Sequence, residues 1–355
     1  MPETAIIPSI TLESGAELRH VPVAYQTWGR LNQAGDNAII VGHSLTSSVD
    51  ASAWWSDCIG PGRALDTDHY FVVCANVIGS PYGTIAPVTV NPETQRPYGI
   101  GLPQATVRDT VRLHKMLLDK LGVRQLAFAI GGSMGGMQVL EWAFYGDYIR
   151  GLVPIGVGGR HSAWCIAWSE AQRQAISADP AYEGGRYAAN CQPTAGLATA
   201  RMIAMISYRS FASFEGRFGR AHTNGVPESP YSVEAYLRHH GEKLVDRFDA
   251  NCYVYLTRLM DTHDVARDRG GYDAILRGIR QDTLVVGIES DVLYRLDEQQ
   301  ELADLLPNAE LAVLEGDHGH DTFLIEQEAL SDAVRAWRKR VIDPHVLTVG
   351  HQPSQ

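Results

Sequence analysis

The stretch AIGGSMGGMQVLEWA, residues 129–143, decides the fold. An apolar run leads into Gly131-Gly132-Ser133-Met134-Gly135, and a helical pattern follows. This arrangement fits G-x-S-x-G, in which glycines two residues on either side of the serine make room for a sharp strand-to-helix turn. The turn would present the Ser133 hydroxyl at a helix N-terminus, which stabilises negative charge. A glycine-rich turn in which Ser133 only caps the helix fits the same residues, so the pattern alone leaves both interpretations open.

Buried strands and helices alternate on both sides of this turn. Apolar runs predict strands over 37–44, 69–79, 124–130 and 149–158, and a helical pattern covers 106–122. Strand–helix–strand alternation of this kind predicts an α/β fold, with a mostly parallel sheet and helices on both faces.

The pattern changes in the middle of the chain. After the strand at 149–158 the sequence becomes helical and amphipathic, and strands return only over 282–291 and 309–320. A closing helix is predicted over 321–341. We therefore predict one α/β core interrupted by a helical insertion, here named the lid, with the core in residues 1–162 and 281–355 and the lid in residues 163–280.

Composition argues against several classes of protein. The chain of 355 residues has a net charge of −11 and no run of Lys or Arg, which argues against nucleic-acid binding. No window approaches the roughly eighteen uninterrupted apolar residues of a membrane span, and the first residues lack the basic start of a secretory signal. The five cysteines are scattered with no C-x-x-C pair, so no metal site is predicted and a cytoplasmic location is expected.

A serine nucleophile needs a histidine base and an acid that orients the base. In this strand–turn–helix architecture the chain order is serine, acid, histidine, each on a loop after a strand. Asp291 and His320 meet both the order and the position. His318 competes with His320, and Glu289 competes with Asp291, so these two alternatives stay open at this point.

Two backbone amides are expected to form an oxyanion hole beside the serine. One belongs to the residue after the nucleophile, Met134. The other is expected in the loop GHSLTSS, residues 42–48, which follows the strand at 37–41, and we assign it to Leu45.

Longer motifs extend over nearly the whole chain. They include WWSDCIGPGRALDTDHYFVVCANVIG (54–79), GGSMGGMQVLEW (131–142) and GHDTFL (319–324). With these motifs the chain resembles the homoserine O-acyltransferase family, in its acetyltransferase branch, which has an α/β-hydrolase fold. The resemblance implies acetyl transfer from acetyl-CoA to the hydroxyl of L-homoserine through an acyl-serine, as a step of methionine biosynthesis. It also implies that no cofactor is permanently bound and that a homodimer forms through the lid.

The resemblance also implies roles for individual residues. Ser133 is the nucleophile and Asp291 the orienting acid, and the GHD motif selects His320 over His318 as the base. The family pattern further places Asp321 at the substrate's amino group and a lid arginine and tyrosine, Arg201 and Tyr208, at its carboxylate.

The spacing of Arg201 and Tyr208 can be judged independently of the resemblance. Seven residues are close to two helical turns, so both side chains share one helix face. Arg can hold a carboxylate through two parallel hydrogen bonds. An exposed arginine and a half-buried tyrosine on an ordinary amphipathic helix would show the same spacing, and by itself the spacing favours that simpler interpretation.

Departures from the family pattern leave substrate specificity open. Ser44 stands where Ala is usual, His239 where Gln is usual, and a proline expected near position 295 is missing. Serine as acceptor, succinyl-CoA as donor, and a carboxylesterase or thioesterase with the same triad are the alternatives, and a non-catalytic binding protein is a more remote one. The lid arginines Arg209, Arg217 and Arg220 fit either CoA phosphates or ordinary salt bridges.

Overall fold

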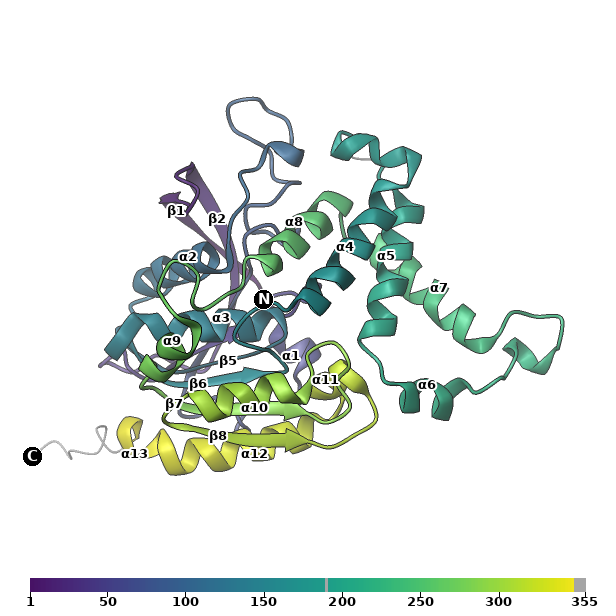
Figure 1. Ribbon diagram of the computed structural model, residues 1–355. Helices are drawn as coiled ribbons and strands as arrows, with labels where there is room; N and C mark the ends of the chain where they lie inside the picture. The colour runs from purple at the N-terminus through teal and green to yellow at the C-terminus, as the bar shows by residue number, and fades with distance from the viewer. Residues whose placement is uncertain (189–190, 348–355) are drawn as a thin grey trace, which may run out of the picture.

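An eight-stranded sheet runs through the described part of the chain, residues 1–188 and 191–347 of the computed structural model (Figure 1). The strand order is β1-β2-β4-β3-β5-β6-β7-β8. The pairs β1–β2 and β2–β4 are antiparallel, and all other neighbours are parallel, which confirms the predicted α/β class. The strands are β1 (Glu3–Thr11), β2 (Glu17–Trp28), β3 (Ala38–Gly42), β4 (Phe71–Ala75), β5 (Leu126–Gly132), β6 (Ile149–Ile155), β7 (Asp282–Ile288) and β8 (Ala309–Leu314).

Helices cover both faces of the sheet, as predicted (Figure 1). On one face, α2 (Val107–Lys120), α3 (Met134–Trp142) and α10 (Leu296–Leu305) pack their apolar side chains into the larger of two cores. On the other face, α1 (Ala51–Trp54) and α12 (Gln327–Val341) enclose a smaller core. The short remaining elements are η1 (Gly99–Gly101), η2 (Ala143–Tyr148), η3 (Pro180–Gly185), η4 (Thr223–Gly225), η5 (Gly319–Asp321), α11 (Thr322–Ile325) and α13 (Asp343–Val346).

The region between β6 and β7 is helical. Its helices are α4 (Ala163–Ser177), α5 (Thr194–Ser207), α6 (Phe211–Phe218), α7 (Ser232–Val245), α8 (Ala250–Asp261) and α9 (Tyr272–Gly278). In Figure 1, α5, α6 and α7 extend away from the sheet, whereas α8 and α9 lie near the core. The predicted boundaries of the lid and of the two core segments stay a prediction, and residues 348–355 of the second segment lie outside the described residues. No helix among the described residues has the length and apolar character needed to cross a bilayer.

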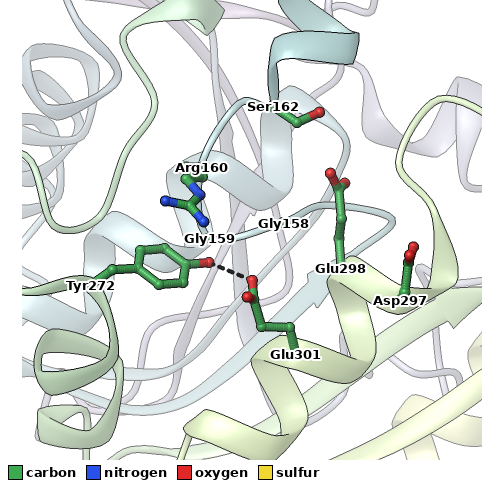
Figure 2. A pocket seen from close by; sticks show the side chains of 8 residues that line it. All are labelled: Gly158, Gly159, Arg160, Ser162, Tyr272, Asp297, Glu298 and Glu301. Atoms are coloured by element: carbon green, nitrogen blue, oxygen red, sulfur yellow. Dashed lines mark hydrogen bonds between the residues drawn. The ribbon is translucent and has the colours of Figure 1, made fainter.

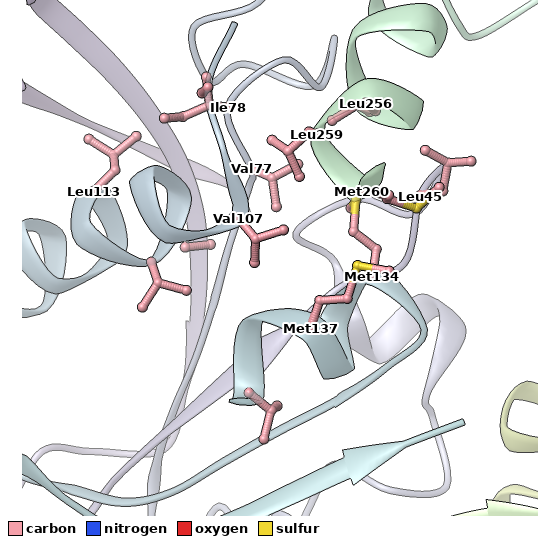
Figure 3. Close-up of a cluster of buried hydrophobic side chains, with 14 of the residues drawn as sticks. Leu45, Val77, Ile78, Val107, Leu113, Met134, Met137, Leu256, Leu259 and Met260 are labelled. Atoms are coloured by element: carbon pink, nitrogen blue, oxygen red, sulfur yellow. The ribbon is translucent and has the colours of Figure 1, made fainter. Parts of the chain in front are cut away.

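The apolar side of α8 reaches the centre of the molecule. Leu256, Leu259 and Met260 share the larger core with Leu45 and Met134 (Figure 3). Part of the lid therefore packs on the two segments predicted to supply the oxyanion amides.

The edge strand β1 is not indicated by the sequence pattern. Its buried positions change phase, from Ala5 and Ile7 to Ile10, across Pro8. In the register with β2, Pro8 falls opposite His20, which has a positive φ of 51°. The irregularity at Pro8 and His20 interrupts the alternation of buried and exposed side chains by which a strand is recognised in a sequence.

The closing helix predicted over 321–341 is present as α11 and α12, but the prediction of a single continuous helix was wrong. The segment is divided at Glu326, whose φ of −85° and ψ of 52° are not helical. In a continuous helix the Phe323 carbonyl would accept a bond from the amide of Gln327. It accepts instead from Trp55 Nε1, at 3.0 Å, so a long-range contact interrupts the local pattern.

Three glycines allow α3 to begin in direct contact with the sheet. A Cβ added to Gly135 would lie 2.1 Å from the carbonyl oxygen of Gly42, and one on Gly131 would lie 2.7 Å from the same oxygen. Ser133, between the two glycines of the turn, has φ 60° and ψ −125°, which a non-glycine residue rarely adopts. The close approach of the three backbones holds this strained turn in place.

We expect Gly135→Ala to destabilise the protein by about 1–3 kcal/mol or more, because the added methyl group meets backbone that cannot move without separating α3 from β3. Gly216→Ala is the matched control, since Gly216 lies in α6 with nothing within 4 Å of an added Cβ. The control should gain about 0.5–1 kcal/mol from the higher helix propensity of alanine. Urea unfolding of both variants tests this, and equal stabilities would contradict the packing argument.

Candidate active site

Ser133 lines a cavity of about 220 Å³ at the carboxyl edge of the sheet. Its amide donates to the Ile155 carbonyl at 3.0 Å, and its own carbonyl accepts from the Met137 amide at 3.2 Å. The side chain forms no capping hydrogen bond with α3, which argues against the interpretation of Ser133 as a simple helix cap. The cavity is lined by Ser44, Leu45, Thr46, Ser47, Ser133, Arg201, Tyr208, Arg247, His320, Asp321, Phe323 and Leu324.

His320 and Asp291 are brought together from the loops after β8 and β7. His320 Nδ1 lies 2.6 Å from Asp291 Oδ2, and both side chains are buried. Asp291 Oδ1 accepts from the amides of Leu293 and Tyr294 at 2.8 and 3.0 Å, so the carboxylate is fixed in orientation. A carboxylate only accepts, so Nδ1 carries the proton and Nε2 keeps a lone pair toward the cavity. In the described part of the chain, Nε2 has no hydrogen-bond partner.

The two competing residues lie elsewhere. His318 Nε2 is 3.4 Å from Glu326 Oε1, and its side chain is 37% exposed. Glu289 is exposed. Neither faces the buried pair formed by Asp291 and His320.

The surroundings of His320 set its proton affinity. Burial alone would lower the pKa of the imidazole, but the negative charge and hydrogen bond of Asp291, aided by the charge of Asp321, raise it above the ordinary value of 6.5. The rings of Tyr208, Tyr294 and Phe323 surround the imidazole, with centroids 5.9, 5.2 and 5.6 Å away. These rings restrict access of water to the imidazole.

If His320 is the base, activity should rise with pH as the imidazole loses its proton, with a midpoint above 6.5 because its pKa is raised. Asp291→Asn removes the negative charge, so the midpoint should move to lower pH, and kcat should fall by about 10⁴-fold through loss of the correct tautomer. The pH profile of kcat/KM for both proteins tests this. An acidic limb that stays in place in Asp291→Asn would contradict the assignment.

The predicted oxyanion amides occupy two neighbouring segments. Met134 is the first residue of α3, where amides have no partner within the helix. Leu45 lies in a tight turn in which the Ser44 carbonyl accepts from the Ser47 amide at 3.1 Å. Leu45 and Ser133 line the same cavity.

His43 holds this turn from inside the protein, a role that the sequence analysis missed. Its Nδ1 lies 2.9 Å from the Ser44 carbonyl oxygen, so Nδ1 is the donor. Burial lowers the pKa of His43, which keeps the ring neutral and leaves Nε2 as an acceptor for the Val77 amide at 3.3 Å. The Asn76 side-chain amide also lies against Nε2, with Oδ1 at 2.9 Å, and a 180° rotation of this amide lets its nitrogen donate to Nε2. In the sequence, the only indication of this role is that a histidine follows the strand predicted at 37–41.

The predicted carboxylate-binding pair lies on one side of the cavity. The Arg201 guanidinium is 5.5 Å from the centroid of the Tyr208 ring, and both residues line the cavity. Among the ion pairs of residues 1–188 and 191–347, none involves Arg201. Its charge is therefore available to an anionic ligand.

Asp321 has a partner that the sequence did not predict. Arg209 Nε lies 3.3 Å from Asp321 Oδ2, so this arginine forms the salt bridge that was one of its two interpretations. Burial raises the pKa of Asp321, and the positive charges of Arg209, His320 and Arg201 oppose the rise. Arg217 lies over the rings of Phe218 and Tyr236, and Arg220 donates to the Tyr231 hydroxyl. These contacts are with aromatic rings and a hydroxyl and are not salt bridges.

A second pocket lies apart from this site, between the β6–α4 connection and α10 (Figure 2). The Arg160 guanidinium lies 4.4 Å from the centroid of Tyr272, whose hydroxyl donates to Glu301 at 3.0 Å. Burial raises the pKa of Glu298 to about 7, while a hydrogen bond from Ser162 opposes the shift. None of the predicted site residues lines this pocket, and no cluster suited to a metal ion is found among the described residues.

Comparisons with known proteins give matches over most of the chain. A family model described as the alpha/beta hydrolase fold matches residues 37–327. A homoserine O-acetyltransferase of Salinibacter ruber is 60% identical to the chain, covering 96% of this chain and 98% of its own. Among solved structures, homoserine O-acetyltransferase from Bacillus anthracis has a TM-score of 0.89 at 24% identity, covering 96% and 98% of the two chains. Esterase E22 has a TM-score of 0.87 at 26% identity, covering 95% and 99%.

Proposed function

The chain belongs to the homoserine O-acetyltransferase family, and we propose that it transfers the acetyl group of acetyl-CoA to the γ-hydroxyl of L-homoserine through an acyl-serine. The observation that carries this proposal is the guanidinium of Arg201, which forms no ion pair within the described residues and lies in the same cavity as Ser133 and His320. An esterase of simple substrates has no need of a carboxylate-binding arginine beside its nucleophile. The product is an activated homoserine for methionine biosynthesis.

In the first half-reaction Ser133 attacks the thioester carbonyl of acetyl-CoA. His320 Nε2 takes the hydroxyl proton, and Asp291 stabilises the imidazolium that forms. The amides of Leu45 and Met134 donate hydrogen bonds to the oxyanion. The carbon–sulfur bond then breaks, the thiolate receives the proton from His320, and CoA leaves an acetyl ester on Ser133.

In the second half-reaction L-homoserine enters the cavity. Its carboxylate binds Arg201 and the Tyr208 hydroxyl, and its ammonium binds Asp321. Arg209 occupies Oδ2 of Asp321, which leaves Oδ1 for the ammonium. His320 takes the proton of the γ-hydroxyl, which attacks the acetyl ester, and the serine oxygen leaves with the proton returned by His320.

Exclusion of water distinguishes this transfer from hydrolysis. The cavity of about 220 Å³ is lined partly by the lid residues Arg201, Tyr208 and Arg247 and has room for a small amino acid, which would displace water from beside Ser133. Acetyl-CoA acts as a co-substrate in this scheme, and no permanently bound cofactor or metal takes part.

The proposed assembly is a cytoplasmic homodimer that forms through the lid. Two large apolar side chains of the lid helices, Ile206 and Phe211, are 44% and 81% exposed. A contact between two lids would cover these side chains.

The direct test measures thiol release from acetyl-CoA with no acceptor, with L-homoserine and with L-serine. Rapid release with L-homoserine alone is the expected result. One methylene in a pocket is worth about 1–3 kcal/mol, so L-serine should react roughly 10- to 200-fold more slowly. Faster release with L-serine would identify L-serine as the acceptor. Equal release without any acceptor would identify a thioesterase, an outcome compatible with the structural likeness to esterase E22. Ser133→Ala, which removes the nucleophile, should abolish release in all three reactions.

Arg201→Ala should raise the KM for L-homoserine by about 100-fold, because a charge-assisted bidentate contact of roughly 3 kcal/mol is lost. The KM for acetyl-CoA should change little. Arg201→Lys should recover only part of the loss, since an ammonium cannot pair with both carboxylate oxygens in parallel. Steady-state kinetics with each substrate varied in turn tests this, and equal changes in both KM values would argue against the carboxylate-binding role.

A further inference from the structure

Arg247 connects the lid to the turn that carries Leu45. It lies between α7 and α8, and its Nη1 donates to the Thr46 carbonyl oxygen at 2.7 Å and to the Tyr82 hydroxyl. Its Nη2 is 3.5 Å from Thr46 Oγ1. Arg247 also lines the cavity of Ser133.

We propose that Arg247 is a positioning residue that fixes the Leu45 amide for oxyanion stabilisation, an inference that rests on the proposed function of the site. The residue acts through the turn and does not touch the reacting atoms. Its guanidinium binds the turn at the Thr46 carbonyl, whereas the buried His43 binds the turn at the Ser44 carbonyl.

The direction of the Leu45 N–H follows from the peptide bond that it shares with Ser44. In a trans peptide the N–H and the C=O point in opposite directions. The Ser44 carbonyl points to His43 Nδ1 and the Ser47 amide, so the Leu45 N–H points away from both.

The Leu45 N–H belongs to the Ser44–Leu45 peptide, which is held by His43 and by the hydrogen bond that closes the turn. The closing peptide is Thr46–Ser47, whose N–H donates to the Ser44 carbonyl oxygen at 3.1 Å. Arg247 binds the carbonyl oxygen of this same peptide, that of Thr46, at 2.7 Å. Arg247 therefore holds the peptide that closes the turn, and through it the peptide that carries the Leu45 N–H.

The lid thereby becomes part of the oxyanion site. Phe248, next to Arg247, packs its ring against Tyr82 with centroids 5.7 Å apart, and α8 covers Leu45 and Met134 (Figure 3). Displacement of this part of the lid would remove the restraint on the turn. Full oxyanion stabilisation therefore requires that this part of the lid stays packed against the turn that carries Leu45.

The test compares Arg247→Ala with Arg258→Ala, which removes the same charge from an exposed position of α8 outside the cavity. Acyl-enzyme formation from acetyl-CoA, transfer to L-homoserine and hydrolysis of p-nitrophenyl acetate are measured for each. Complete loss of one oxyanion donor costs about 10²–10³-fold in kcat, so a displaced donor should cost about 10- to 100-fold. Arg247→Ala should slow all three reactions by a similar factor with both KM values nearly unchanged, and Arg258→Ala should behave as the wild type.

Two further variants separate positioning from folding and from binding. Tyr82→Phe removes only one partner of Arg247 and should give a smaller loss, and Arg247→Lys should recover part of the activity.

A raised KM for acetyl-CoA with normal ester hydrolysis would overturn the proposal in favour of donor binding. A raised KM for L-homoserine alone would overturn it in favour of acceptor binding. A wild-type protein that hydrolyses the ester but does not acetylate L-homoserine would refute the proposed function, while the ester reaction would still test Arg247.

Discussion

The contact between the backbones of Gly42 and Gly135 is the constraint on which the site depends. It sets the start of α3 directly against β3 and leaves Ser133 in a strained conformation at the sheet edge. Carboxyl ends of parallel strands meet at one edge, so the loops after β7 and β8 bring Asp291 and His320 to the same place. A short backbone contact thus determines where the serine, acid and histidine converge.

Much of this arrangement follows from local sequence. The G-x-S-x-G spacing indicated the turn, and strand-end positions indicated Asp291 and His320. The choice between His318 and His320 depends on the turn at Gly319, whose positive φ of 65° and close approach to Arg209 reflect packing against the lid. Residue spacing carries no information about such a contact, so a longer motif was needed to select His320.

The features that could not be predicted are contacts between distant segments. His43 with Asn76, Arg209 with Asp321, and Trp55 with the Phe323 carbonyl each join residues whose separation leaves no periodic pattern. Each one fixes an element of the site or ends a helix. The lid adds a contact of the same kind through Arg247, so the proposed acceptor-binding residues on α5 and the anchor of the proposed oxyanion turn belong to the same helical region.

The central claim is that an acetyl group resides on Ser133 between two half-reactions. Mixing the protein with acetyl-CoA alone, quenching in acid and measuring the mass of the Ser133 peptide tests it most directly. The account predicts an acetylated peptide that disappears when L-homoserine is added before the quench. Turnover without this species, or an acetyl group on another residue, would contradict the account.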